Sequence, residues 1–154
     1  MTDLEVRTAS VDDVPGVEPL VADSLSQLAT LRGGIALLEM IGMPPGAGPE
    51  EVSSALCGQA LLGTTTLVAT LSGSVVGVAV VVRTEAGLDL IGIHTARSMR
   101  RRRIGTTLLD ATRAIASELG VRFEALALPG DQTVKSLLEA GGFKARLLRM
   151  AADR

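Results

Sequence analysis

Ile93–Leu109 reads IHTARSMRRRRIGTTLL and decides the fold, because an apolar run typical of a strand passes through five arginines into an amphipathic helix. Beyond the arginines the apolar residues recur at helical spacing, at Ile104, Leu108, Leu109 and Ile115. The first turn of a helix leaves four backbone N–H groups unpaired and carries about half a positive elementary charge. Arginines at that end add charge of the same sign. The pattern therefore predicts an anionic ligand such as a phosphate, on which N–H and guanidinium groups would converge.

The arginine run has two other interpretations, a solvated loop and a polyanion-binding surface. The whole chain carries a net charge of −2 with a pI of about 5.4, and it contains neither Tyr nor Trp. Nucleic-acid-binding domains usually present a broad basic face and stacking aromatic side chains. The composition therefore predicts no nucleic-acid partner, and polyanion binding is the weaker alternative.

Length and composition predict one domain spanning residues 1–154, with 47% hydrophobic residues to form its core. The single Cys57 excludes an intramolecular disulfide and a cysteine zinc cluster, and it fits a small buried side chain better than a nucleophile. The acidic N-terminus is unlike a signal peptide, and Ser72–Ser74 interrupts the most apolar stretch before it reaches the ~20 residues of a membrane-spanning helix. We expect a cytoplasmic protein with no membrane segment and no metal.

Hydropathy periodicity predicts helices and strands in alternation. Period-two and β-rich runs indicate strands at residues 4–9, 65–71, 75–83, 88–95, 122–128 and 143–150. Helical spacing, caps and breakers indicate helices at residues 10–30, 35–41, 49–62, 104–120 and 132–140. The three strands between residues 65 and 95 follow one another through short turns, so we expect them to be antiparallel neighbours.

Three motifs resemble one known family. Arg100-x-x-Arg103-Ile104-Gly105, followed by a Leu-Leu pair, is similar to the acyl-coenzyme-A-binding signature of the GNAT superfamily of N-acetyltransferases, where glycine usually stands in place of Arg103. VRTASVDD at residues 6–13 and LLEAGGF at residues 137–143 also look like elements of that family. The resemblance covers essentially the whole chain. It implies an α/β (α+β) fold with a mixed, mainly antiparallel twisted sheet of six or seven strands and helices on both faces, in the order β-α-α-β-β-β-α-β-α-β.

The resemblance also implies an activity, the transfer of an acetyl group from acetyl-CoA to a primary amine of a small molecule or a protein by direct attack in a ternary complex. The diphosphate of coenzyme A would bind the first turn of the helix after the arginines, and its pantetheine arm would follow a strand that diverges from its neighbour. The residues implied for these contacts are Ile93, Thr95, Arg100, Arg101, Arg102, Arg103, Ile104, Gly105, Thr106 and Asp131. For Asp131, the role of N-cap of the last helix is favoured over contact with the cofactor.

Two residues are candidates for the catalytic base. Asp89 stands where histone-type members carry a glutamate, and His94 is the only histidine. Their numbers differ in parity, so their side chains should leave opposite faces of the strand unless a bulge intervenes, and at most one is the base. The alternatives are a solvated carboxylate for Asp89 and a hydrogen-bonded structural imidazole for His94. Glu85 and Glu124 remain candidates through a relayed water.

Departures from the family pattern leave a second function open. Leu138 stands where many members carry a tyrosine proton donor, and Arg103 replaces a glycine that tolerates close approach to phosphate. Both would suit a non-catalytic module that binds or senses acyl-CoA, whereas an enzyme would protonate the leaving thiolate from water. Leu31–Gly63, implied to cover the acceptor, is apolar around Met40 and Met43. This composition fits ordinary core packing, an apolar acceptor or a homodimer contact.

Overall fold

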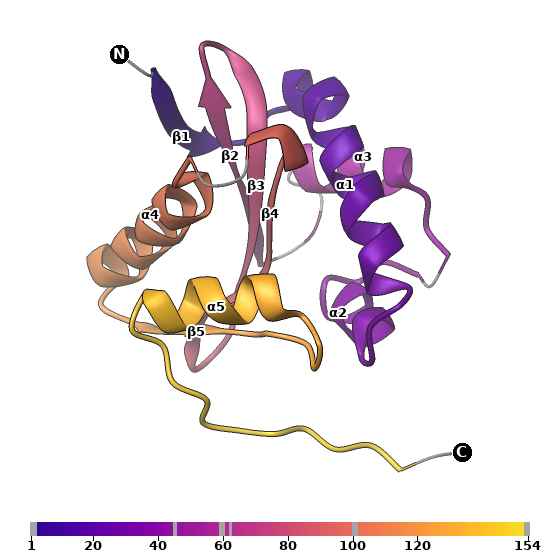
Figure 1. Cartoon of the computed structure of the whole chain (residues 1–154), viewed down its shortest axis with the longest axis vertical. Helices are drawn as coiled ribbons and strands as arrows, with labels where there is room; N and C mark the ends of the chain where they lie inside the picture. The colour runs from indigo at the N-terminus through magenta and orange to yellow at the C-terminus, as the bar shows by residue number, and fades with distance from the viewer. Residues whose placement is uncertain (1–2, 45, 59–60, 62, 100–101, 153–154) are drawn as a thin grey trace.

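The computed structural model describes residues 3–44, 46–58, 61, 63–99 and 102–152, and these form one sheet covered by helices (Figure 1). The strands are Leu4–Thr8 (β1), Thr64–Leu71 (β2), Ser74–Arg83 (β3), Gly87–Thr95 (β4) and Arg122–Ala125 (β5), in the spatial order β1-β2-β3-β4-β5. The α-helices are Val14–Leu28 (α1), Gly34–Met40 (α2), Pro49–Cys57 (α3), Ile104–Leu119 (α4) and Gln132–Ala140 (α5). A 3₁₀ turn at Val11–Asp13 precedes α1, and another at Arg97–Met99 follows β4.

The sheet is mixed and mainly antiparallel. Strands β1 to β4 pair antiparallel in sequence order, and β4 pairs with β5 in parallel. The turn from β2 to β3 consists of Ser72 and Gly73, both with positive φ, which is the backbone twist that favours a tight two-residue hairpin. The prediction that the three strands between residues 65 and 95 are antiparallel neighbours is therefore confirmed.

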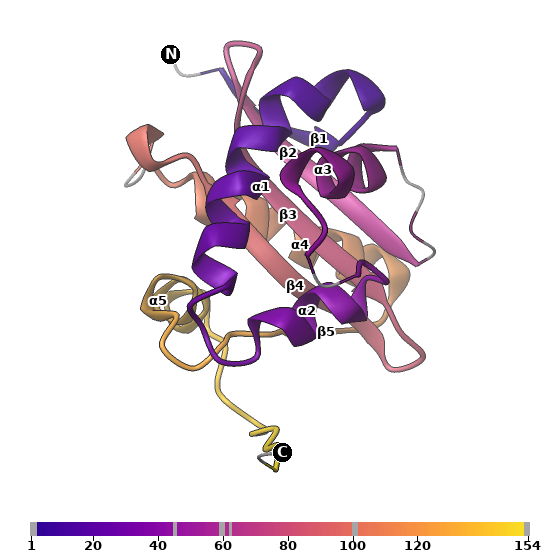
Figure 2. The ribbon, with the colours of Figure 1, turned by 90° about the vertical axis from the view of Figure 1, so that its right-hand side faces the viewer.

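Helices cover both faces of the sheet, as predicted. Helices α1, α2 and α3 lie over one face, and α4 and α5 lie on the other side (Figures 1 and 2). Alternate side chains of each strand enter different cores: on β2, Leu67 packs with the α4 side and Val68 with the α1 side. Helix α4 buries Leu108 and Leu109 at no more than 1% exposure, so the predicted helical stripe is its inner face. Within the described residues, every helix is too short or too polar to cross a membrane.

The predicted strand at residues 143–150 is wrong, and the described sheet has five strands where six or seven were expected. Phe143 packs edge-on against Phe123, with ring centroids 5.5 Å apart, and the chain then leaves the body of the molecule (Figure 1). Leu147, Leu148 and Met150 are 82% to 89% exposed. An alternating segment forms a strand only where the edge of another strand is within reach, and this segment extends away from the edge of β5 (Figure 1).

Candidate functional site

The start of α4 is an uncapped helix end. Arg103 before it adopts the left-handed conformation, with φ +62° and ψ 21°, and makes no side-chain cap. Ile104 is 2% exposed and fixes the first turn against the sheet, whereas Gly105 and Thr106 line a cavity. The first-turn amides, for which the described residues provide no intrahelical acceptor, therefore lie at the edge of open space, where an anion would be stabilised.

Gly105 allows this turn to approach α5 closely. A Cβ atom built on Gly105 would lie 3.2 Å from Cδ2 of Leu137, tighter than ordinary van der Waals contact. Of the predicted arginines, Arg103 lines the cavity and Arg102 is exposed. Arg100 and Arg101 lie outside the described residues, so the structure gives no account of them.

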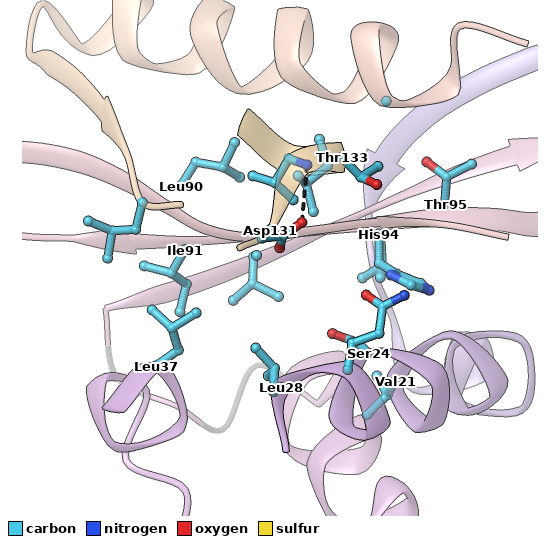
Figure 3. Close-up of a pocket in the computed structure, with 18 of the residues that line it drawn as sticks. Val21, Ser24, Leu28, Leu37, Leu90, Ile91, His94, Thr95, Asp131 and Thr133 are labelled. Carbon is cyan, nitrogen blue, oxygen red and sulfur yellow. Dashed lines mark hydrogen bonds between the residues drawn. The ribbon is translucent and has the colours of Figure 1, made fainter. Parts of the chain in front are cut away.

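The cavity has a volume of about 560 Å³, within the range of small-molecule sites. Its walls come from α1 and α2 on one side, from β4 in the middle, and from the first turns of α4 and α5 on the other. Figure 3 shows His94 and Thr95 at one end with Ser24, and Leu37 and Ile91 at the other. The arrangement brings together, around one space, the predicted residues Ile93, His94, Thr95, Arg103, Ile104, Gly105, Thr106 and Asp131.

The cavity exists because β4 and β5 diverge. Their pairing ends at Leu90 and Ala125, apart from one hydrogen bond from the Leu126 amide to the Leu90 carbonyl, while β4 continues to Thr95. Within the described residues, the β4–β5 register does not continue beyond this point. Ile93 and Thr95, on the part of β4 that follows, line the cavity.

A bulge in β4 changes the faces of the two candidate bases. Val80 pairs with Gly92 and Val81 pairs with Leu90, so Ile91 is the extra residue. Ile91 packs with the α1 side, whereas Leu90 before it and Ile93 two positions after it pack with the α4 side. The bulge reverses the alternation, and Asp89 and His94 therefore leave β4 on the same face.

The two candidates nevertheless occupy different surroundings. Asp89 does not line the cavity; it pairs in register with Val82 and Glu124 near the start of β4. Burial, and next the Glu124 carboxylate, raise the pKa of Asp89, against a smaller opposite effect of Arg122. His94 lines the cavity, and its side chain is 10% exposed.

His94 is held by a residue that the sequence analysis missed. Its Nε2 lies 2.7 Å from Oδ2 of Asp23 on α1, and Nη2 of Arg97 lies 2.8 Å from the other Asp23 oxygen. The hydrogen bond from Arg97, and to a smaller extent the one with His94, hold the pKa of Asp23 below its ordinary value against the opposing effect of burial. Nothing in the local sequence links Asp23 to His94, because 71 positions separate them.

Three other predicted residues have clear structural positions. Asp131 is the N-cap of α5, its carboxylate accepting a hydrogen bond from the Val134 amide at 3.2 Å, and it also lines the cavity. Leu138 is 6% exposed in the core beneath α4, so its position carries no proton donor. Cys57 is 1% exposed and burial raises the pKa of its thiol, which fits a small core side chain.

Among the described residues, no group of three or more His, Cys, Asp or Glu side chains is arranged so that it could bind a metal ion.

Solved structures share this architecture. A ribosomal-protein-alanine N-acetyltransferase from Brucella melitensis biovar Abortus 2308 superposes with a TM-score of 0.73 at 14% identity, covering 98% of this chain and 99% of that one. The aminoglycoside N-acetyltransferase AAC(6')-Iy in complex with CoA gives 0.70 at 16% identity, covering 100% and 96%. The PaiA N-acetyltransferase from Thermoplasma acidophilum in complex with coenzyme A gives 0.70 at 16% identity, covering 94% and 91%.

At the level of sequence, no curated protein matches the chain significantly. The profile of the acetyltransferase (GNAT) family, by contrast, matches residues 42–143. That span includes the diverging strands, the arginine run and the helix that follows it. It is about two thirds of the chain, and the fold agrees over its full length. The chain therefore belongs to the acetyltransferase (GNAT) family.

Proposed function

We propose that this protein transfers an acetyl group from acetyl-CoA to a primary amine by direct attack in a ternary complex. The observation that carries the proposal is a single cavity lined both by the first turn of α4 and by His94 on β4. Family membership and two similar structures solved with coenzyme A support the choice of donor.

The donor would bind at the start of α4 and along the neighbouring part of β4. The first-turn amides of α4 and the Arg103 guanidinium would hold the diphosphate. The edge of β4 from Ile93 to Thr95 would hydrogen-bond the pantetheine arm, and Asp131 would lie beside it. Backbone N–H groups of that edge would also stabilise the negative charge that develops on the thioester oxygen.

The acceptor amine must be uncharged to attack, which requires a base near the thioester. We assign that role to His94, because it lines the cavity and Asp23 holds its ring. The Asp23 carboxylate would stabilise the imidazolium formed when His94 takes the proton of the amine. Asp89 is the second candidate and would need a relayed water, because it lies outside the cavity wall.

The amine nitrogen attacks the carbonyl carbon, the carbon–sulfur bond breaks, and coenzyme A leaves as a thiolate. Leu138 is buried where many family members carry a tyrosine, so the thiolate would take its proton from water. A thiol with a pKa of about 8.5 is a fair leaving group without a dedicated acid. The same residue favours a second candidate function, a non-catalytic module that binds acyl-CoA.

Ligand-induced stabilisation and thiol release together test the proposal. Acetyl-CoA at about a hundred times its Kd should stabilise the folded protein by about 2.7 kcal/mol, measured as a rise in Tm. Addition of a panel of primary amines should then release free coenzyme A, measured with a thiol reagent. His94→Gln should lower kcat by about 100-fold while leaving the rise in Tm unchanged, because removal of a general base affects proton transfer and not donor binding.

Asp89→Asn serves as the matched variant on the same strand and face. Retained turnover in this variant supports His94 as the base. Loss of turnover in Asp89→Asn with full activity in His94→Gln would transfer the role to Asp89. A rise in Tm without thiol release from any amine would favour the non-catalytic module, and the absence of both would contradict the proposed function.

A further inference from the structure

We infer that the acceptor is a primary amine carried on an apolar body, and that the end of the cavity beneath α2 binds this body. The inference rests on the proposed function and names its substrate class. It adds a specificity determinant, the apolar end of the cavity, defined by Leu25, Leu28, Leu37, Leu38, Ile41 and Ile91.

The apolar end is built by elements that meet over the diverging strands. Helix α1 contributes Leu25 and Leu28, and α2 contributes Leu37 and Leu38. The bulged residue Ile91 faces them from β4, because the extra residue lies on the α1 side of the sheet. Figure 3 shows Leu37 and Ile91 together, away from His94 and Thr95.

The position of the base fixes which part of the acceptor enters this end. His94, Thr95 and Ser24 lie together at the other end (Figure 3), and the first turn of α4 borders Thr95. An amine placed for proton transfer to His94 must lie close to that side chain. Its substituent then has the apolar end as the remaining space within a cavity of about 560 Å³.

Charge also discriminates between classes of amine. Among the described residues that line the cavity, the ionisable ones are His94, Arg103 and Asp131, and the one carboxylate among them, Asp131, already accepts the hydrogen bond of the α5 cap. A second ammonium group carried into the apolar end would be desolvated without a counter-charge, which is strongly unfavourable. An apolar body, in contrast, gains the transfer free energy of its surface. The lining therefore selects against polycationic amines.

An acceptor series on the wild-type protein tests this directly. With saturating acetyl-CoA, kcat/KM should rise about threefold to fourfold for each methylene added from ethylamine to hexylamine, until the apolar end is filled. Phenethylamine should react well, whereas spermidine and kanamycin should react at least 100-fold more slowly than hexylamine. A parallel series from acetyl-CoA to hexanoyl-CoA, with ethylamine as acceptor, measures whether the donor chain uses the same space.

Leu37→Asp tests the location, with Ile35→Asp as its matched control. Both residues lie on α2, but Leu37 lines the cavity whereas Ile35 is 57% exposed and outside its wall. Leu37→Asp should lower kcat/KM for hexylamine more than tenfold and raise it for 1,6-diaminohexane, whose second ammonium would meet the new carboxylate. The stabilisation by acetyl-CoA should be unchanged in both variants. Ile35→Asp should keep the wild-type preference.

The outcomes separate the inference from the proposed function. A flat alkylamine series, or faster reaction of spermidine or kanamycin, would contradict the apolar acceptor while leaving the acetyltransferase in place. A rate that rises with acyl length instead of amine length would assign the apolar end to the donor and overturn the inference. If Leu37→Asp does not fold, the wild-type series still decides between these results. Failure of every amine to release coenzyme A would contradict the proposed function itself.

Discussion

Arg103 shows how one residue carries both strain and a candidate function. Its φ of +62° is a left-handed conformation in which any side chain except glycine is disfavoured, by about 1–2 kcal/mol. Glycine usually stands at this position in the family, and the structure shows why, because the turn into α4 requires that backbone. The strain is retained beside the uncapped helix end, where a guanidinium would add attraction for phosphate.

Arg103→Gly should therefore separate stability from donor binding. We expect the free energy of unfolding to rise by up to about 1 kcal/mol, because glycine relieves the left-handed strain at some cost in chain entropy. Affinity for coenzyme A should fall as the charge is lost. Urea unfolding and titration of coenzyme A measure the two effects.

Arg102→Gly is the control for both effects. Arg102 is exposed, and its φ is not among the positive values of the described residues. This variant should be no more stable than the wild type. Equal stabilisation by both substitutions would show that the conformation of Arg103 is not the cause.

Single residues also mark the limit of what the sequence could predict about the site. The grouping of Ile93, Thr95 and residues 103–106 around one cavity could be predicted, because they lie close together in the sequence where a strand passes into a helix. The shared face of Asp89 and His94 depended on the bulge at Ile91, for which the glycine at position 92 was the available signal. The contact of Asp23 with His94 could not be predicted, since a contact across 71 positions leaves no trace in local spacing.

At the scale of elements, one ion pair joins the end of β1 to the start of α1. Both terminal nitrogens of Arg7 donate to the Asp13 carboxylate, at 2.7 and 2.8 Å, and the Ser10 amide donates to it at 2.8 Å. Asp13 is 6% exposed, so its charge depends on these partners. The hydrogen bond from Arg7 is the largest influence that lowers the pKa of Asp13.

Asp13→Asn should destabilise the protein in a pH-dependent way. Because the pKa of Asp13 is lowered in the folded state, its stabilisation is fully present above the ordinary carboxyl pKa of about 3.9 and is lost as the pH falls through the lowered value. We expect a loss of about 1–3 kcal/mol at pH 7, typical of hydrogen bonds to a charged group. The difference from wild type should shrink below pH 4 in urea unfolding. The neighbouring exposed Asp12, changed to Asn, should cost less than about 0.5 kcal/mol at either pH.

Helices and strands could be predicted where a local sequence pattern coincides with a neighbouring element that the segment can pair with or pack against. Strands β2 to β4 combine β-branched residues with short turns, and their neighbours in sequence are their neighbours in the sheet. Residues 143–150 alternate equally well, yet Leu147 and Leu148 remain exposed because the chain turns away after Phe143. Periodicity records which face a strand would bury, and it does not record whether a partner edge is within reach.

At the scale of the whole molecule, two cores share one sheet. Adjacent residues of β2 enter different cores, so the loss of either layer of helices would expose one apolar face of strands whose other face packs against the remaining layer. The cavity has walls from both layers, α1 and α2 on one side and α4 and α5 on the other. The geometry of the site therefore depends on the two layers folding together.

Matched truncations in the two layers test this coupling. Leu20 on α1 is 6% exposed in one core, and Leu108 on α4 is 0% exposed in the other. Each Leu→Ala change should lower the free energy of unfolding by about 2–5 kcal/mol. Each change should shift one unfolding transition, and circular dichroism and hydrogen exchange in the layer that was not mutated should report the same shift. Leu119, on α4, is 51% exposed, and Leu119→Ala should shift the transition little. Two separate transitions, or loss of protection confined to the mutated layer, would show that the layers unfold independently, and a ligand seated between them would then be expected to restore the coupling.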